Sequence, residues 1–271
     1  MLLPMSRFTS LPPILRQAIA GRRLLKVIAG LTNFDQASVL SIARAAAAGG
    51  ADLVDIACDP SLVKAVAAAC PQLPICVSAV DPELFAAAVA AGATMVEIGN
   101  FDAFYAQGRV FSAAEVLELT RRSRALLPAV VLSVTVPHRL PLDQQEQLAV
   151  DLQAAGADLI QTEGGTSARP FSAGSLGLIE KAAPTLAAAH AISRALAAAS
   201  PEPLPVLCAS GLSAVTVPLA LAAGASGVGV GSVVNRLGDP LAMVAVVRGL
   251  REAIEAPARL VGGGAGVAAQ A

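Results

Sequence analysis

The chain has 271 residues, of which 55% are hydrophobic and only 14% are charged, and its formal net charge is −1. This length suits one large α/β domain or two small ones, and the apolar fraction is sufficient for a large core. A nearly neutral chain without a basic cluster lacks the electrostatic footprint of nucleic-acid binding, so we expect no nucleic-acid partner.

The segment before the first predicted strand, residues 1–23, is an N-terminal extension. It contains no continuous apolar stretch of the kind found in a secretory signal, so we expect a cytoplasmic protein. The cysteines show no CxxC spacing, which favours buried thiols in a reducing compartment over a redox or metal site. They stand at Cys58, Cys70, Cys76 and Cys208.

A short pattern recurs along the chain. The stretch "AGGADLVDIA" at 48–57 returns as "AAGATMVEIG", "AAGADLIQTE" and "AAGASGVGVG" at 90–99, 154–163 and 222–231. Each copy reads as an Ala-rich helix end, a glycine that stops the helix, and an apolar strand. A second kind of strand, mostly preceded by Leu-Pro, alternates with these. The predicted strands are Lys26–Gly30, Leu53–Ala57, Ile75–Ala79, Met95–Gly99, Val130–Thr135, Leu159–Glu163, Val206–Ala209 and Val228–Gly231.

Ala-rich segments with helical periodicity follow each of the eight strands. Alternating strands and helices of this number predict a (β/α)₈ TIM barrel, a single α/β domain over residues 24–256. Residues 1–23 would add a helix over the barrel bottom, and residues 257–271 would form a flexible Gly/Ala tail. An open doubly wound sheet is the alternative, although "GVGVGS" stands at the wrong end of the chain for a dinucleotide fingerprint.

The uncharged run from Pro203 to Asn235 is long enough to span a membrane. Prolines and glycines interrupt it repeatedly, which indicates a buried strand, a helix and a second strand. We therefore expect no membrane association.

Alignment of the repeats on their glycines assigns side chains to the two faces of four strands. The branched aliphatic residues are expected to face the helices, and the opposite parity points into the barrel in layers. The first interior layer is Leu53, Met95, Leu159 and Gly227, and the second is Asp55, Glu97, Gln161 and Gly229. The layer at the strand tops is Ala57, Gly99, Glu163 and Gly231.

The interior thus becomes polar toward the carboxyl ends of the strands, where barrel enzymes place their active sites. An unpaired buried carboxylate costs on the order of several kcal/mol, so these groups need a cation, a proton or a ligand. The candidate catalytic residues are Asp55, Glu97, Glu163, Lys26 on the first strand, and His138 in the loop after the fifth. The alternative is a salt-bridge network that only stabilises the core.

Two loops of small residues, "CASGLS" and "GVGVGSVVN", follow the seventh and eighth strands. Barrels often bind phosphate at these loops through backbone amides. The candidate phosphate-binding residues are Ser210, Gly211, Gly229, Gly231 and Ser232. The alternative is that the glycines only permit tight turns.

Four of the eight aromatic residues fall within "EIGNFDAFYAQGRVF", after the fourth strand. They are expected either to roof the site or to form a subunit contact, with Asp102 and Arg109 facing a ligand. The longest loop, "QTEGGTSARPFSAGS", follows the sixth strand and is a candidate closing lid. The candidate lid residues are Asn100, Phe104, Tyr105, Gly164, Gly165 and Arg169.

A set of motifs resembles the hypothetical chloroplast reading frame twenty-three family of cyanobacteria and some algal plastids. They are "GLTNFD", "VDIACDP", "ICVSAVDP", "VEIGNFDAFYAQGR", "SVTVPH", "QTEGGTS", "CASGLSAVT" and "GVGVGSVVN". The likeness covers roughly Leu25 to Ala253. It implies a TIM barrel of a photosynthetic prokaryote or plastid, located in the plastid stroma if plastid-encoded, and it implies no particular reaction.

Three functions remain open. The first is an enzyme that binds a small phosphorylated metabolite and uses acid–base carboxylates, with a lyase, isomerase or synthase activity favoured by analogy with other phosphate-binding barrels. The second is an FMN-dependent oxidoreductase that holds the FMN phosphate on the same two loops. The third is a non-catalytic ligand sensor or assembly protein that presents Phe104 and Tyr105 to a partner.

No metal site is expected, because the sequence has no tight oxygen-ligand motif; magnesium on the paired carboxylates is a less favoured alternative. The apolar helices allow a homo-oligomer, but the sequence does not determine its stoichiometry.

Overall fold

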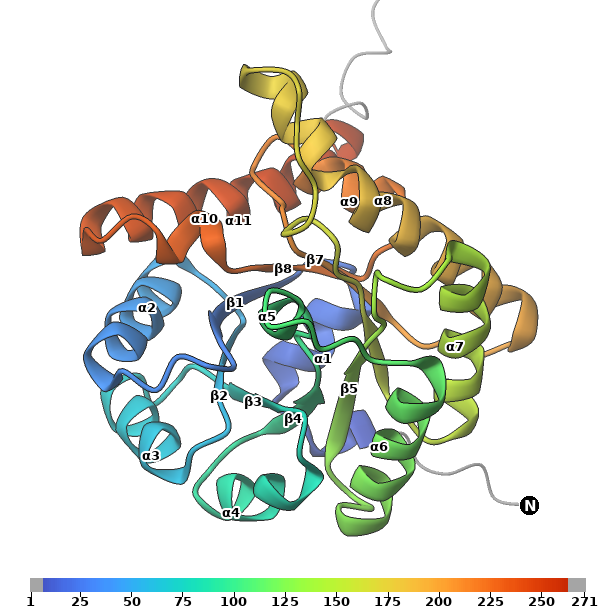
Figure 1. Cartoon of the computed structure of the whole chain (residues 1–271). Coiled ribbons are helices and arrows are strands. Elements are labelled where there is room, and N and C mark those ends of the chain that lie inside the picture. Colours follow the sequence, from blue (N-terminus) through green and yellow to red (C-terminus); the bar gives the residue numbers. More distant parts are fainter. Residues whose placement is uncertain (1–6, 263–271) are drawn as a thin grey trace, which may run out of the picture.

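Eight parallel strands form the centre of the structure: β1 (Leu24–Gly30), β2 (Leu53–Ala57), β3 (Ile75–Ala79), β4 (Met95–Ile98), β5 (Val131–Thr135), β6 (Leu159–Gln161), β7 (Val206–Ala209) and β8 (Gly227–Val230). They pair in chain order, and β8 also pairs with β1, so the sheet closes into a barrel (Figure 1). The computed structural model describes residues 7–262. The predicted (β/α)₈ barrel is confirmed, and the open doubly wound sheet is wrong.

Helices surround the barrel, and the chain places at least one after every strand. They are η1 (Arg7–Ser10), α1 (Pro13–Ala20), α2 (Gln36–Gly49), α3 (Pro60–Ala69), η2 (Pro82–Leu84), α4 (Phe85–Ala90), α5 (Asp102–Tyr105), α6 (Ala113–Leu126), α7 (Leu142–Ala154), α8 (Gly174–Ala199), α9 (Val217–Ala222), α10 (Ser232–Asn235) and α11 (Pro240–Gly262). The helix α11 includes residues 257–262 of the predicted tail. The rest of that tail, and residues 1–6, lie outside the described residues.

Local sequence explains where several helices begin and end. The carboxylates of Asp35 and Asp59 accept hydrogen bonds from the free backbone N–H groups at the starts of α2 and α3. The four repeat glycines all adopt positive φ, as the repeat predicts: Gly50, Gly92, Gly156 and Gly224. Each therefore turns the chain from a helix toward the next strand.

The predicted strand parity is confirmed by the packing. Val54, Val96, Ile160 and Val228 belong to the core between the barrel and the helices. Leu53, Met95 and Leu159 belong to a separate cluster inside the barrel. The interior is therefore apolar at the amino ends of the strands.

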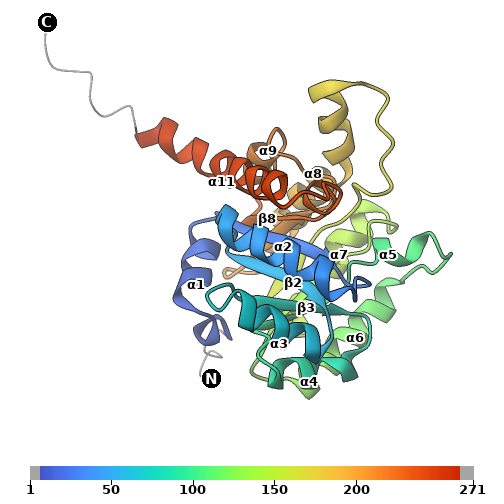
Figure 2. The same ribbon diagram turned by 90° about the vertical axis from the view of Figure 1, so that its left-hand side faces the viewer.

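The helix α1 packs against this interior cluster through Leu15 and Ala18, and Leu11 before the helix joins them. Figure 2 shows α1 at one end of the barrel and α5 at the opposite end. The amino ends of the strands are thus covered, and the carboxyl ends remain available for a site.

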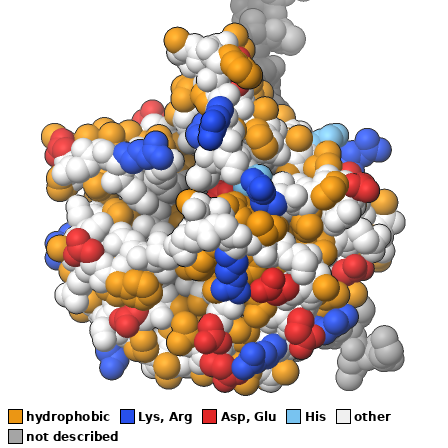
Figure 3. All heavy atoms as spheres, viewed as in Figure 1, with side chains coloured by type: hydrophobic (Ala, Val, Ile, Leu, Met, Phe, Trp, Pro, Cys, Tyr) orange, Lys and Arg blue, Asp and Glu red, His pale blue; other side chains and the backbone are white. Residues whose placement is uncertain are grey.

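The helix α8 is 26 residues long, and its first turns project beyond the barrel together with the preceding loop (Figure 2). Figure 3 shows hydrophobic side chains on this projection, where Phe171 is 99% exposed. Even so, no helix within residues 7–262 combines the length and hydropathy needed to cross a membrane.

Candidate functional site

The polar layer of the barrel interior is a closed hydrogen-bonded network around Lys26. Its Nζ lies 2.7 Å from Glu97 Oε2 and 3.1 Å from Gln161 Oε1. Asp55 Oδ2 lies 3.4 Å from the same ammonium group. All four side chains are buried, as the parity of the strands predicts.

The protonation of this network follows from its contacts. Burial by itself lowers the pKa of Lys26, but the charges of Asp55 and Glu97 outweigh burial and raise that pKa above its ordinary value. Burial raises the pKa of Glu97, and Lys26 opposes this rise. Lys26 is therefore a cation that neutralises the carboxylates, which argues against its use as an imine-forming amine.

Asn100 closes the network from above. Its Nδ2 donates to Asp55 Oδ2 at 3.2 Å and to Glu97 Oε1 at 3.3 Å. Its Oδ1 accepts a hydrogen bond of 3.1 Å from Gln161 Nε2. The residue adopts a left-handed φ of 60° directly after β4, which turns the side chain inward. Asn100 was predicted as a lid residue, and here its side chain bonds to the buried polar layer.

A cavity of about 200 Å³ opens at the carboxyl ends of the strands. Asn100 lies in its wall, whereas Lys26, Asp55 and Glu97 do not. Four of the five predicted phosphate-binding residues also line it; Gly229 does not. The polar and small residues that line the cavity include Asn100, Asp102, Glu163, Ser210, Gly211 and Ser232.

Two loops shape one side of this cavity. Ser210 and Gly211, after β7, both adopt left-handed backbone conformations, with φ of 76° and 77°. Gly165 packs against them so closely that an added Cβ would lie 2.4 Å from Gly211 Cα. After the adjacent strand β8, Gly231 leads directly into the short helix α10, which begins at Ser232. The small residues thus allow close backbone approach in this wall of the cavity.

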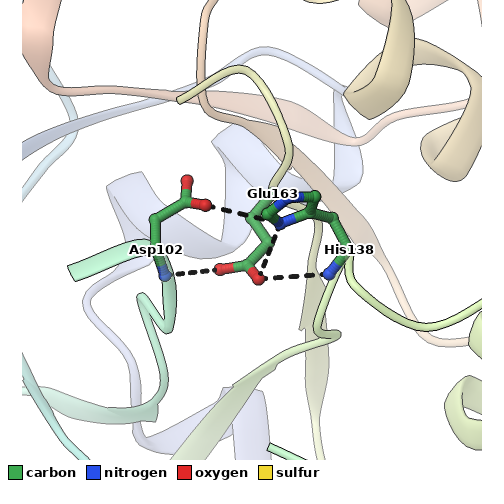
Figure 4. A group of neighbouring side chains, drawn as sticks. All are labelled: Asp102, His138 and Glu163. Atoms are coloured by element: carbon green, nitrogen blue, oxygen red, sulfur yellow. Dashed lines mark hydrogen bonds and ion pairs between the residues drawn. The ribbon is translucent and has the colours of Figure 1, made fainter. Parts of the chain in front are cut away.

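Three charged or titratable side chains meet at the cavity wall (Figure 4). Nδ1 of His138 lies 3.2 Å from Glu163 Oε1 and 3.4 Å from Asp102 Oδ1. These residues follow β5, β6 and β4, so three neighbouring strands bring them together. Asp102 and Glu163 line the cavity directly.

Glu163 is held in a fixed position by donors around it. Its Oε2 accepts from the backbone N–H of Asp102, and its Oε1 accepts from the backbone N–H of His138, each at 3.1 Å. The Tyr105 hydroxyl also donates to Oε1. Burial raises the pKa of Glu163, the Asp102 charge adds to the rise, and the hydrogen bonds from His138 and Tyr105 oppose it.

Tyr105, another residue of the predicted lid, contacts Glu163 and His138. Burial raises its pKa, and the charge of Glu163 raises it further. The ring of Tyr105 meets that of His138 edge-on, with centroids 5.0 Å apart. Tyr105 is therefore a neutral donor that positions Glu163 and His138.

The other aromatic residues of this stretch form a small core. Phe101 and Phe111 are fully buried with ring centroids 4.3 Å apart, and Phe104 packs edge-on against Phe111. Arg109 stacks over the Phe111 ring at 4.3 Å and does not line the cavity. The ring of Phe104 is only partly buried against this core, and its role as a roof or a partner surface stays a prediction.

The loop after β6 packs closely against its neighbours at its start. Gly164 and Gly165 are buried between His138 and the Ser210 loop, and the closing lid stays a prediction. Arg169 is exposed, and within residues 7–262 its side chain has no hydrogen bond or ion pair. The sequence also missed Ser78 and Ser133, which donate to Asp55 and Glu97. Both serines lie on odd-numbered strands, at alternate positions that face the barrel interior. This alternation could have identified them from the sequence.

The fold resembles that of several solved barrel enzymes. Superposition on 3-hexulose-6-phosphate synthase gives a TM-score of 0.59 at 19% identity, covering 85% of this chain and 99% of that one. For thiamine phosphate pyrophosphorylase from Pyrococcus furiosus the TM-score is 0.54 at 16% identity, covering 87% and 96%. At these identities the likeness shows the fold alone, a closed parallel barrel surrounded by helices.

Sequence comparison then identifies the family. The family model "Protein of unknown function (DUF561)" matches residues 11–259. The uncharacterized protein ycf23 of Cyanophora paradoxa is 44% identical over 223 residues, which cover 82% of this chain and 89% of that protein. The ycf23 protein of Pyropia yezoensis is 37% identical over 234 residues, covering 86% and 83%. The chain belongs to this family, and the resemblance identified from the motifs is confirmed.

Proposed function

We propose that the protein binds a small phosphorylated metabolite in the cavity and catalyses a lyase or isomerase reaction on it. One observation carries the proposal: a single cavity borders both the small-residue loops after β7 and β8 and the carboxylates of Asp102 and Glu163. Close-approach loops at this end of a barrel suit a phosphate group. The rest of the ligand would then lie against the charged wall.

The size of the cavity supports a small ligand. Pockets that hold drug-sized molecules have volumes of about 300–1,000 Å³. The cavity here, about 200 Å³, lies below that range. It therefore favours a short phosphorylated metabolite over the larger FMN molecule of the alternative hypothesis.

The solved barrels with this fold support the class of ligand without choosing the substrate. One is a (S)-3-O-geranylgeranylglyceryl phosphate synthase from Thermoplasma acidophilum with its substrate sn-glycerol-1-phosphate, at a TM-score of 0.55 and 14% identity over 90% of this chain and 97% of that one. Because one fold hosts many reactions, this analogy extends only to a phosphorylated ligand at the cavity.

The proposal is tested by calorimetric titration of the protein with a panel of short phosphorylated metabolites. Substitution of Ser232→Glu places a negative charge on the exposed start of α10, where the phosphate would bind. We expect it to weaken binding about tenfold or more, which corresponds to about 1.4 kcal/mol. Ser61→Glu, at the exposed start of α3 and outside the cavity, is the control and should bind as wild type does.

Two results would contradict the proposal: no phosphorylated metabolite binds, or the Ser232→Glu variant binds as tightly as wild type. Phosphorus NMR of the bound ligand then separates enzyme from sensor. New phosphorus signals that depend on the protein indicate turnover, whereas stable binding without new signals indicates the non-catalytic alternative.

A further inference from the structure

We infer that Asp102, His138 and Glu163 form a binding site for a divalent transition-metal cation at the inner wall of the cavity. Each residue offers one ligand atom, and the three atoms lie within 4.8 Å of one another (Figure 4). An imidazole nitrogen with two carboxylate oxygens is a ligand set that suits zinc, manganese or iron.

The distances between the ligand atoms fit such an ion. In a tetrahedral zinc site with bonds of about 2.0–2.2 Å, two ligand atoms are about 3.3–3.6 Å apart. Nδ1 of His138 lies 3.2 Å from Glu163 Oε1 and 3.4 Å from Asp102 Oδ1. The two carboxylate oxygens lie within 4.8 Å of each other, a separation that a bound cation would shorten.

An unsatisfied polar atom gives an independent sign of a missing ligand. Asp102 Oδ1 is buried and has no hydrogen-bond partner in the part of the chain that the structure describes, although it lies 3.4 Å from Nδ1 of His138. A buried carboxylate oxygen without a donor is costly, and such orphaned atoms are rare. A cation bound to Asp102 Oδ1 would remove this cost.

The balance of charge points the same way. In the layer below, Lys26 lies between Asp55 and Glu97 and neutralises them. The upper carboxylates, Asp102 and Glu163, have no such partner: among the side chains of residues 7–256, His138 alone is close enough for an ion pair. Two nearby carboxylates in a protected site need a positive charge, and a divalent cation supplies it.

The surroundings already hold the ligands in place. The Tyr105 hydroxyl and the backbone N–H groups of Asp102 and His138 donate to Glu163. Oγ of Ser210 donates to Asp102 Oδ2 at 2.9 Å. Hydrogen bonds of this kind orient metal ligands and increase their affinity for the ion.

The position of the site suggests that the ion would contact the bound metabolite. This role of the ion rests on the proposed function. Since Asp102 and Glu163 line the cavity, open coordination positions would face the bound metabolite. A cation there would bind an oxygen of the metabolite and stabilise negative charge that develops on it during reaction.

The test is a titration of the full-length, chelator-treated protein with Zn²⁺ by calorimetry and with Co²⁺ by absorption spectroscopy. We expect one equivalent to bind wild type, with a Co²⁺ spectrum that lacks thiolate charge-transfer bands. His138→Gln and Asp102→Asn should each weaken binding by about 100-fold or more. His190→Gln removes the other histidine of the chain, an exposed residue of α8, and should leave binding unchanged.

The inference is overturned if wild type shows no saturable binding, or if binding persists in both His138→Gln and Asp102→Asn. Circular dichroism verifies that the variants are folded. Should His138→Gln fail to fold, Asp102→Asn decides the matter, because it keeps the backbone hydrogen bond to Glu163. The titration contains no phosphorylated metabolite, so its failure and the failure of the proposed ligand binding are separate results.

Discussion

Asn100 connects the interior of the barrel to the cavity through a single side chain. It bonds both buried carboxylates, Asp55 and Glu97, while it also lines the cavity. The left-handed backbone at φ 60° makes this reach possible, and asparagine tolerates that conformation better than most residues. Both the side chain and the backbone conformation should therefore contribute to stability.

Two substitutions separate these contributions. Asn100→Gly loses the side-chain hydrogen bonds but tolerates the positive φ, and we expect it to reduce the free energy of unfolding by about 2–3 kcal/mol. Asn100→Ala loses the same bonds and also strains the backbone, so it should be about 1 kcal/mol less stable than the glycine variant. Urea unfolding measures both. An alanine variant as stable as the glycine variant would show that backbone strain is unimportant here.

At the scale of elements, α1 is a short helix that packs against the barrel through one apolar face. Leu15 is 1% exposed and packs against the interior cluster, whereas its neighbour Ile14 is 56% exposed. A helix of eight residues is too short to be stable alone, so this apolar face must hold it under the barrel.

The adjacent residues give a matched pair of variants. Leu15→Ala should reduce the free energy of unfolding by about 2–5 kcal/mol, because it leaves a cavity between α1 and the strands. Ile14→Ala should change it by less than about 0.5 kcal/mol, as is usual for exposed positions. Chemical denaturation of both variants compares them directly, and equal losses would mean that α1 does not close the barrel as described.

At the scale of the whole molecule, closure of the barrel depends on the junction between β8 and β1. Gly227 pairs with Leu24, and an added Cβ would lie 2.5 Å from the Leu24 carbonyl oxygen. Gly227 therefore allows the first and last strands to approach each other.

Gly227→Ala should consequently destabilise the whole barrel. Overpacking typically costs about 1–3 kcal/mol, and for a chain of this size each kcal/mol lowers the unfolding midpoint by about 2–4 °C. Gly249→Ala in α11 is the control, since an added Cβ there meets nothing within 4 Å and should stabilise the helix by about 0.5–1 kcal/mol. Thermal unfolding of both proteins tests the difference, and a Gly227→Ala variant as stable as wild type would contradict it.

The sequence by itself determined the barrel, its strands and the direction of their side chains. These follow from local rules: a glycine ends each helix of the repeat, and alternate residues of a strand face opposite ways. The buried positions of Asp55 and Glu97 followed from that parity, and Lys26 on the first strand was among the candidate catalytic residues.

Only the tertiary structure decided what meets at the carboxyl ends of the strands. Asp102, His138 and Glu163 stand far apart in the chain, and their contact depends on the conformations of three loops, which no periodic pattern describes. The residues of the aromatic stretch likewise have different environments. Phe101 and Phe111 pack in the core, whereas Tyr105 donates a hydrogen bond to Glu163. Strand periodicity fixes which side of a sheet a residue occupies, but contacts between loops depend on how the whole barrel closes.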